Sequence, residues 1–264
     1  MILAVVCVAA AAAPLLAPRG PADAHLIDRL KPPGSRDASG RVYYLGTDPL
    51  GRDELSRLLF GARISLLVGL SAVVIGGALG VGLGLYAGYH GGWADDVVMR
   101  LGDIQLAFPS ILLYIAVLAV LGPGLVKVIV ILGVTGWATF GRVARAQVLG
   151  VRELEFVSAA QAAGCGTART ITRHILPNIL APVIVLASFG VAANIIAESS
   201  LSFLGLGVPP AVSSWGTMLS DAQQYLRDAW WPAALPGLAI TLTVLAFNAV
   251  GDWLRDYLDP HLRE

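Results

Sequence analysis

The chain has 264 residues, of which 56% are hydrophobic and 14% charged, and its mean hydropathy is +0.72. Soluble domains carry roughly 25% charged residues, so the composition excludes an ordinary soluble domain and predicts an all-α membrane protein. The formal net charge is zero, which gives no electrostatic reason to expect a nucleic-acid partner. The two cysteines, Cys7 and Cys165, lack the spacing of a metal or redox site.

Residues 1–18 are apolar and marginally long enough for a first spanning helix, since about 20 residues cross a bilayer. The alternative is a secretory signal peptide, because Ala22-Asp23-Ala24 resembles a cleavage site. No positive charge precedes the apolar run, as a signal peptide requires. We therefore favour the helix, and the missing positive flank suggests a natural start upstream of Met1.

Residues 19–63 form a polar connection rich in proline, glycine and aspartate. The run LGTDPLGRD stands at its centre, at residues 45–53, and its Asp-Pro and Leu-Gly pairs are typical of turns. Residues 54–61 predict a short surface helix before the next span. The connection is therefore expected to be an ordered loop.

Residues 64–89 contain no charge and predict the second span. Glycine recurs at every fourth position along one helical face, at Gly76, Gly80, Gly84 and Gly88. Small residues at this spacing let two transmembrane helices approach closely. We therefore expect this face to pack against another helix of this chain or of a paired subunit.

Residues 90–103 are polar and predict a short hairpin. Residues 104–126 predict a third span, in which Pro109 should kink the first turns. Residues 128–140 predict a short fourth span, and its end near Arg142 is the least defined boundary.

Residues 153–178 interrupt the spans with two short polar helices, which together we call the docking loop. The first helix, residues 153–163, is rich in alanine and exposes little side-chain bulk, which favours close contact with a partner. Gly164 allows the left-handed conformation that ends a helix. The second helix should begin with Thr167 as its N-cap and end at Pro177.

The fifth span, residues 179–197, contains Asn194 and is followed by Glu198 on the same helical face. Polar groups at such depth are costly and usually face a protein interior or a watery cavity. In one interpretation Glu198 lies at the headgroup level and caps the span. In the other, the pair lines the outer part of a translocation path or holds an external gate by hydrogen bonds.

Residues 199–231 form a second polar connection, in which Trp230 and Trp231 mark a membrane interface. Residues 233–251 predict the sixth span. Asn248 and Asp252 form a similarly spaced polar pair at its opposite end.

The sequence contains no HExxH, GxSxG, Rossmann or P-loop motif. We therefore expect no catalytic residue and no cofactor bound by this chain. We also expect no metal site, because the spacing of the histidines does not pair them as metal ligands; they are His25, His90, His174 and His261. A secondary transporter would need intramembrane ions or broken helices in two related halves, and no such repeat is visible. Uptake by a secondary transporter would depend on an ion gradient rather than on ATP.

The docking loop resembles the coupling motif of ABC importer permeases, which has a small-residue helix, a glycine and an Ile-x-Leu-Pro ending. The residues that fill these positions are Ser158, Ala159, Ala160, Gly164, Ile175 and Pro177. The motif begins with glutamate where this chain has Ser158, so a role of that carboxylate cannot be carried over. The runs LGTDPLGRD, SFLGLG, WGTML and GDWLRDYLDP resemble the C-type permease subunits of the dipeptide, oligopeptide and nickel importers.

This resemblance implies a type I ABC importer permease fold with about six spans, in which residues 1–63 form the first helix and its connection and residues 64–264 the permease domain. It implies a multi-pass protein of the bacterial inner membrane, with the docking loop in the cytoplasm and the connections 19–63 and 199–231 outside. The positive-inside rule alone does not decide this orientation, because both sides carry basic residues.

The implied partners are a second homologous permease subunit, two ATP-binding subunits that carry ATP and Mg²⁺, and an extracytoplasmic substrate-binding protein. The implied function is ATP-driven import of di- and oligopeptides. Nickel or another small solute is the alternative cargo within the family, and a secondary transporter is the alternative outside it.

Overall fold

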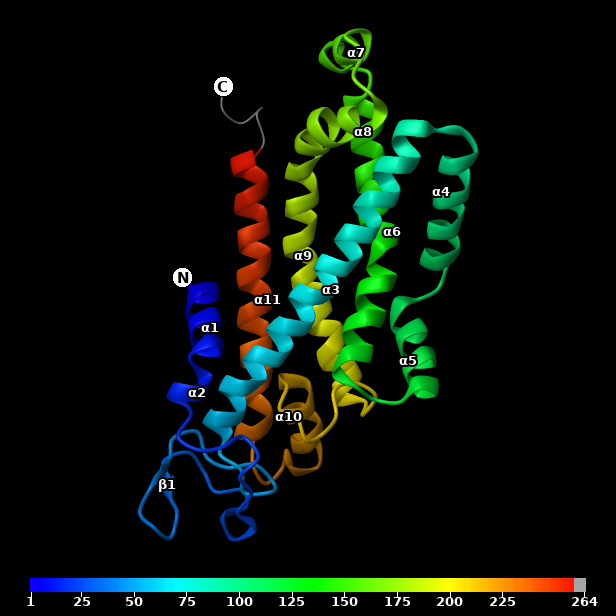
Figure 1. The fold of residues 1–264 in the computed structure, drawn as a ribbon. Helices are drawn as coiled ribbons and strands as arrows, with labels where there is room; N and C mark the ends of the chain where they lie inside the picture. Colours follow the sequence, from blue (N-terminus) through cyan, green and yellow to red (C-terminus); the bar gives the residue numbers. More distant parts are fainter. Residues whose placement is uncertain (259–264) are drawn as a thin grey trace. The chain divides into compact units, whose positions relative to one another are not determined.

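The computed structural model describes residues 1–258 and confirms the helical membrane fold. Among these residues, four helical segments are long and apolar enough to cross a membrane: α3 (Glu54–His90), α6 (Leu125–Val151), the segment Thr167–Phe203 and α11 (Trp231–Leu258). A fifth candidate is the pair α4 (Gly92–Ala107) and α5 (Ser110–Leu121), which is bent by 85° (Figure 1).

The predicted count of about six spans is not reached within the described residues. The N-terminal apolar run is divided into α1 (Ile2–Ala11) and α2 (Ala13–Leu16). Pro14 lies in the first turn of α2, where it cannot donate a backbone hydrogen bond and crowds the preceding turn. The 10 residues of α1 are shorter than a bilayer requires.

Two predicted boundaries are wrong because charged residues continue the helices. The expected surface helix at residues 54–61 is the start of α3. The predicted fourth span at residues 128–140 is part of α6, which contains Arg142 and Arg145 and ends at Val151. Arg145 pairs with the mostly buried Asp95 of α4 at 2.5 Å, whereas Arg142 and its partner Asp103 are both exposed.

The predicted hairpin at residues 90–103 is also wrong, because most of this stretch is helical in α4. Pro109 does more than kink a span. Phe108, just before it, is extended with ψ 135°, since the proline ring disfavours helical geometry in the residue that precedes it. The result is two helices, α4 and α5, with a bend of 85° between them.

The chain divides into two compact units, and each is described separately. Unit 1 comprises residues 1–70, 114–129 and 191–247, and unit 2 comprises residues 71–113, 130–190 and 248–264, of which 259–264 lie outside the described residues. The divisions fall inside helices, so α3, α5, α6, α9 (Leu176–Phe203) and α11 contribute to both units. Whether residue 63 separates two functional domains stays a prediction.

Unit 1 contains most of the short elements. A two-stranded antiparallel sheet pairs β1 (Ser35–Arg36) with β2 (Val42–Tyr43), in the register Ser35 to Tyr43. The remaining short elements are η1 (Leu26–Asp28), α10 (Trp215–Ala222) and η3 (Gln223–Tyr225). The sequence analysis left both connections as loops.

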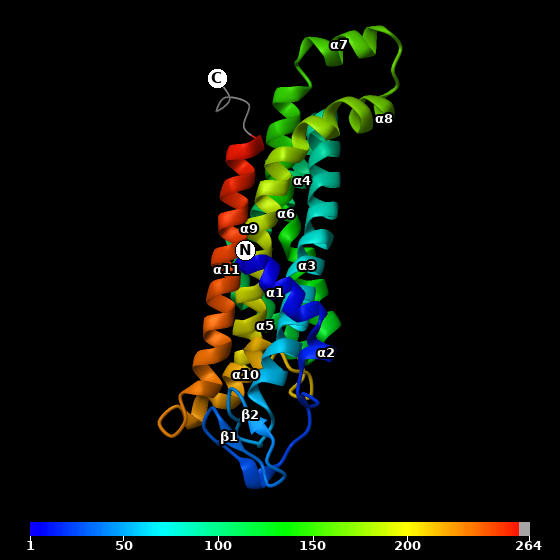
Figure 2. The same ribbon diagram turned by 90° about the vertical axis from the view of Figure 1, so that its left-hand side faces the viewer.

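Unit 2 contains the docking loop, which consists of α7 (Glu155–Ala162), α8 (Thr167–Thr170) and the π-helical turn η2 (Ile171–Ile175). α7 and α8 extend beyond the adjoining ends of α6 and α9 (Figure 2).

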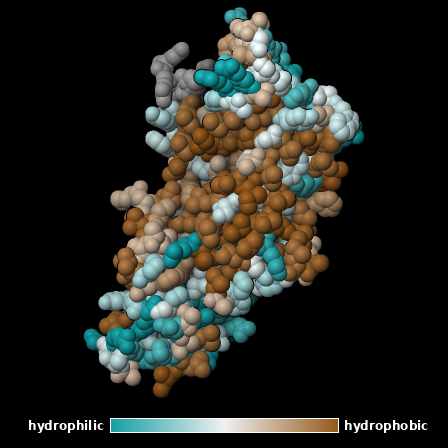
Figure 3. Space-filling view, in the orientation of Figure 1, coloured by the Kyte–Doolittle hydropathy of each residue, from teal (hydrophilic) through white to brown (hydrophobic). Residues whose placement is uncertain are grey.

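Hydrophobic side chains cover a broad part of the molecular face in Figure 3, as helices in contact with lipid or with partner helices require.

Candidate functional site

The first arm of the docking loop exposes several small residues, together with the larger side chain of Phe156, which is 42% exposed. α7 begins at Glu155 rather than at residue 153, and Ser158 and Ala159 are exposed while Ala160 is partly buried. Exposed serine and alanine present backbone and small side chains instead of long flexible ones. A partner can therefore approach this helix without ordering many rotamers.

The corner after α7 is closed by the backbone. The Gly164 N–H donates to the Gln161 carbonyl at 2.9 Å, and the Cys165 N–H donates to the Ala160 carbonyl at 3.0 Å. This pair of bonds is the Schellman arrangement, which needs a left-handed residue at the position of Gly164. Its φ of +83° confirms the predicted conformation, and a methyl group added there would meet no atom within 4 Å.

The second arm differs from the prediction at both ends. Gly166, not Thr167, is the N-cap of α8. Pro177 does not end the helix, because it lies in the first turn of α9 directly after η2. The Leu176 N–H bonds to the Ile171 carbonyl, and this wider π turn carries the helix through the place where proline lacks a donor.

Buried apolar side chains attach the docking loop to the spanning helices. Val157 of α7 and Ile175 of η2 are fully buried. They belong to one cluster with Leu85 of α3, Val148 of α6 and Ile179 of α9. The docking loop is therefore packed against three spanning helices, α3, α6 and α9.

Polar contacts add to this attachment. Arg152, beyond the end of α6, donates to the Gly88 carbonyl of α3 at 2.8 Å. Gln161 of α7 donates to the Tyr89 hydroxyl at 3.2 Å. The end of α3 is thus held by both the helix before the loop and the loop itself.

The predicted glycine face of α3 lies directly against α6. A methyl group added at Gly76 would come within 2.8 Å of the Gly133 carbonyl oxygen, and one at Gly88 within 2.9 Å of Val148 Cβ. At Gly80 and Gly84 it would overlap the carbonyl oxygens of α6 outright. All four glycines are buried. The partner helix contributes glycines of its own, Gly133, Gly136 and Gly141, which the sequence analysis did not match to this face.

In unit 1, Glu198 lies in a cradle of serines. The Ser202 hydroxyl donates to Glu198 Oε1 at 2.7 Å, and the hydroxyls of Ser65 and Ser199 lie 3.3 and 3.4 Å from Oε2. The Glu198 side chain is completely buried. Asn194 is half-buried, and no hydrogen bond joins it to Glu198 within residues 1–258. The structure therefore gives Glu198 partners other than the one that the sequence suggested.

The serine cradle joins several elements. Ser65 belongs to α3, and its hydroxyl accepts the Trp215 N–H of α10 at 3.4 Å. The Ser202 hydroxyl of α9 accepts the Val208 N–H at 3.0 Å. Glu198 thus stands where α3, α9 and the start of α10 meet.

The run LGTDPLGRD forms a buried ion-pair network that the sequence analysis missed. Asp48 Oδ2 lies 2.5 Å from both Arg52 Nε and an Arg57 guanidinium nitrogen. The same arginines donate to Asp221 of α10 at 2.7 and 2.9 Å. The network ties the connection 19–53 to α3 and α10. The structure buries Arg57 completely, and the only signal for it in the sequence was a cation a few residues before an apolar span.

A second polar cluster, centred on Asp28, orders the part of the connection that precedes this network in the sequence. Asp28 pairs with Lys31 at 2.5 Å and accepts the Tyr43 hydroxyl at 2.8 Å. The hydrogen bond from Lys31 holds the pKa of Asp28 below its usual value. Burial, with the bond to Asp28 as a smaller cause, raises the pKa of Tyr43 to about 12.

Residues 80–264 match the family described as binding-protein-dependent transport system inner membrane component. The di/tripeptide transport system permease protein DppC of Pseudomonas aeruginosa is 45% identical over 263 residues, which cover 100% of this chain and 86% of the relative. The glutathione transport system permease protein GsiD of Pectobacterium atrosepticum is 44% identical over 84% of this chain and 74% of the relative.

The fold has solved counterparts. A crystal structure of an amino acid ABC transporter matches with a TM-score of 0.58 and 15% identity, over 76% of this chain and 94% of the transporter chain. This likeness concerns the fold alone, and it agrees with the predicted type I permease architecture.

Proposed function

The chain belongs to the family of binding-protein-dependent transport system inner membrane components, and we propose that it imports di- and oligopeptides together with a second, homologous permease subunit. It is a multi-pass permease of an ABC importer in the inner membrane. The peptide substrate is supported by the name of the relative that is 45% identical to the whole chain.

The docking loop is the proposed contact with the ATP-binding subunits, which would carry ATP and Mg²⁺. The single observation that supports this role is the exposure of small residues on α7 combined with the complete burial of Val157 in the same helix. One side of the helix is free for a partner and the other is locked into the core. The residues that we assign to coupling are Ser158, Ala159, Ala160, Gly164, Ile175 and Pro177.

The mechanism follows from that attachment. Nucleotide-driven closure of the ATP-binding subunits would move α7, and Val157 with Ile175 would transmit the movement to α3, α6 and α9. Tight packing at the glycine face lets α3 and α6 move as one body. The expected result is a rigid-body alternation between inward and outward access.

We assign Asn194 and Glu198 to the outer part of the translocation path or to the external gate. The serine cradle supports the gate more than the path, because the Glu198 carboxylate is buried and bonded to protein groups. An extracytoplasmic binding protein would deliver the peptide on this side, where the proposed orientation places the connections 19–63 and 199–231.

Reconstituted transport tests the proposal. The complete importer is placed in liposomes, and uptake of a labelled dipeptide, glutathione and nickel is compared with and without ATP and with and without the binding protein. We expect dipeptide uptake that requires both. Uptake driven by an ion gradient without ATP would instead identify a secondary transporter, and ATP-driven uptake of nickel alone would replace the peptide substrate.

A further inference from the structure

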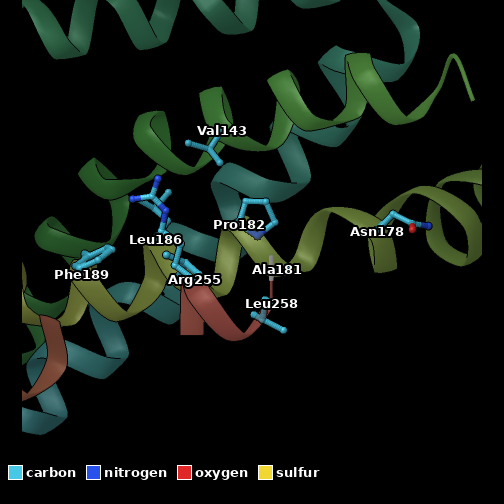
Figure 4. A pocket seen from close by; sticks show the side chains of 9 residues that line it. Val143, Asn178, Ala181, Pro182, Leu186, Phe189, Arg255 and Leu258 are labelled. Carbon is cyan, nitrogen blue, oxygen red and sulfur yellow. The ribbon is translucent and has the colours of Figure 1, made fainter. Parts of the chain in front are cut away.

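A cavity of about 570 Å³ in unit 2 has mainly apolar walls that come from α6, α9 and α11 (Figure 4). Its polar lining residues, Asn178 and Arg255, are both exposed. Exposed polar groups can bond to groups outside the chain, so this cavity does not define a ligand. A polar group that water cannot reach lies instead in unit 1, at the start of α3.

Glu54 is the first residue of α3, and its side chain is almost completely buried. Its Oε2 atom has no hydrogen-bond partner within residues 1–258. Glu54 precedes the uncharged stretch 64–89 by ten residues. It therefore lies before the part of this 37-residue helix that crosses the bilayer, which needs about 20 residues.

The charges nearest to Glu54 are already paired with one another. Arg52 and Arg57 each donate to Asp48 and to Asp221. Two arginines and two aspartates balance, so this network leaves no cation for Glu54. A buried carboxylate without a paired cation is costly, whereas the protonated acid is neutral.

The network is complete in its list of charged groups. Those that act on Glu54 directly are Arg57 on α3 and Asp48, Arg52 and Asp53 on the connection before it. Those that reach it through these residues are Arg19, which lies 3.8 Å from Asp53, and Asp221 on α10.

Burial raises the pKa of Glu54 to about 8, although the charge of Arg57 acts in the opposite direction. With that pKa, about 1% of Glu54 is ionised at pH 6 and about 90% at pH 9. Glu54 and Arg57 are three positions apart on one helix, so their side chains are neighbours. An ionised Glu54 therefore competes with Asp48 and Asp221 for the Arg57 guanidinium.

Asp221 is the point at which this competition reaches α10. It accepts from Arg52 at 2.7 Å and from Arg57 at 2.9 Å, and both bonds hold the end of α10 against the connection. The start of α10 lies at the serine cradle, because the Trp215 N–H donates to the Ser65 hydroxyl. A weaker hold on Asp221 thus loosens the helix that begins beside Glu198.

We propose that Glu54 is a proton-binding switch for α10. With its proton, Glu54 leaves both arginines to Asp221, and α10 stays against the connection. Without its proton, Glu54 draws Arg57 away from Asp221, and α10 is loosened. In the proposed orientation Glu54 lies on the extracytoplasmic side, so the pH outside the membrane controls the switch. The switch is independent of the cargo that is imported.

Labelling of a buried cysteine on α10 tests the switch. Ala222 is buried at the end of α10, and Gln224 is exposed on η3. Ala222→Cys and Gln224→Cys are made one at a time in the purified importer, in a chain that lacks Cys7 and Cys165. The labelling rate at 222 is divided by the rate at 224, because the pH dependence of the thiol acts on both.

We expect this ratio to rise about tenfold between pH 6 and pH 9, as the loss of one hydrogen bond to a charged group predicts. Glu54→Gln keeps the neutral form and should hold the ratio at its low value throughout. Asp221→Asn removes the charge that the arginines hold, so its ratio should already be high at pH 6. Glu153→Gln is the matched control, because the Glu153 side chain is 73% exposed, and it should leave the rise unchanged.

Thermal unfolding of the same complexes gives a second measurement. Because the folded-state pKa of Glu54 is raised, the natural chain loses stability as the pH rises from the unfolded value of about 4.3 to about 8. The melting temperature of the natural chain should therefore fall relative to that of Glu54→Gln over this range. Above it, the difference should stay constant.

Three results would overturn the switch. The first is a labelling ratio in the natural chain that does not change between pH 6 and pH 9, which needs no Glu54 variant. The second is a rise that persists in Glu54→Gln. The third is a rise of the natural size in Asp221→Asn, because the arginines then have no charged partner on α10 to lose.

Discussion

Glu198 buries its carboxyl group among hydroxyl groups. Ser199 and Ser202 lie on α9, as Glu198 does, and the Ser65 hydroxyl reaches the carboxyl group from α3 at 3.3 Å. A buried carboxyl oxygen without a partner would cost free energy. The contact with Ser65 can therefore help to hold α3 and α9 together.

We predict that Glu198→Gln reduces transport while the importer still assembles. The amide keeps the shape of the side chain but replaces one accepting oxygen with an NH₂ group that cannot accept from a serine hydroxyl, and Glu198→Ala removes the contacts altogether. Uptake by assembled complexes is the measurement. If both variants transport normally with intact binding protein and ATP-binding subunits, Glu198 has no gating role.

Asp28 gives a pH-dependent contribution to the stability of the connection 19–53. Its folded-state pKa is lowered by Lys31, so its contribution is complete above the unfolded value of about 3.9 and is lost as the pH falls through the folded value. The difference in melting temperature between the natural chain and Asp28→Asn should accordingly be constant near neutral pH and shrink below about pH 4. A difference that grows on acidification would contradict this assignment.

At the scale of whole elements, the close packing of α3 against α6 depends on glycines, which place no side chain between the two helices. Gly80 faces the α6 backbone, whereas Gly82 on the same helix is exposed and has no atom within 4 Å of an added methyl group. The two positions differ in packing and share the same helix, so they form a matched pair.

We expect Gly80→Leu to separate the two helices and to cost about 1–3 kcal/mol. Gly82→Leu should have almost no effect, since its side chain would enter open space. Thermal unfolding of the detergent-solubilised complex compares them. Equal melting temperatures for the two variants would mean that the glycine face does not determine stability.

The sequence predicted the elements whose signal is local. Four glycines in register identified a close helix contact, and Gly164 identified a left-handed corner. It failed where distant residues decide the outcome. Arg145 of α6 has its partner on α4, and the helix continues past Pro177 through a π turn that no local pattern indicated.

The candidate sites divide in the same way. Small residues at the docking loop were recognisable in the sequence, but the buried partners of Val157 come from three separate helices. The network of Asp48, Arg57 and Asp221 joins residues more than a hundred positions apart. Sequence separation of that size leaves no periodic pattern to read.

For the molecule as a whole, orientation in the membrane is the first consequence to test. We predict that Ser158 faces the cytoplasm and that the connection 199–231 faces outward. Ser213, in that connection, is buried and contacts Arg57, so Gln224 on exposed η3 is the better reporter. Cysteine replaces each residue in turn, in a chain that lacks Cys7 and Cys165.

An impermeant thiol reagent added to intact cells should modify cysteine at position 224 and not at position 158. After the membranes are opened, position 158 should also react, because it is exposed on α7. The reverse pattern in intact cells would mean that the protein is inserted the other way round.

The central claim is that α7 couples the ATP-binding subunits to the spanning helices. Gly164→Arg adds bulk beside the exposed face of α7, and Ala159→Arg adds it on the helix itself without a strained φ. Gly92→Arg is the matched control, because Gly92 also has a positive φ and open space but lies at the start of α4.

The decisive measurement is ATP hydrolysis stimulated by the binding protein and its peptide, together with uptake, in purified complexes of the three variants. We predict that Gly164→Arg and Ala159→Arg lose stimulated hydrolysis and uptake, through weaker retention of the ATP-binding subunits or through uncoupling, while Gly92→Arg behaves as the natural chain does. Normal assembly, hydrolysis and uptake in both α7 variants would contradict the proposed coupling role.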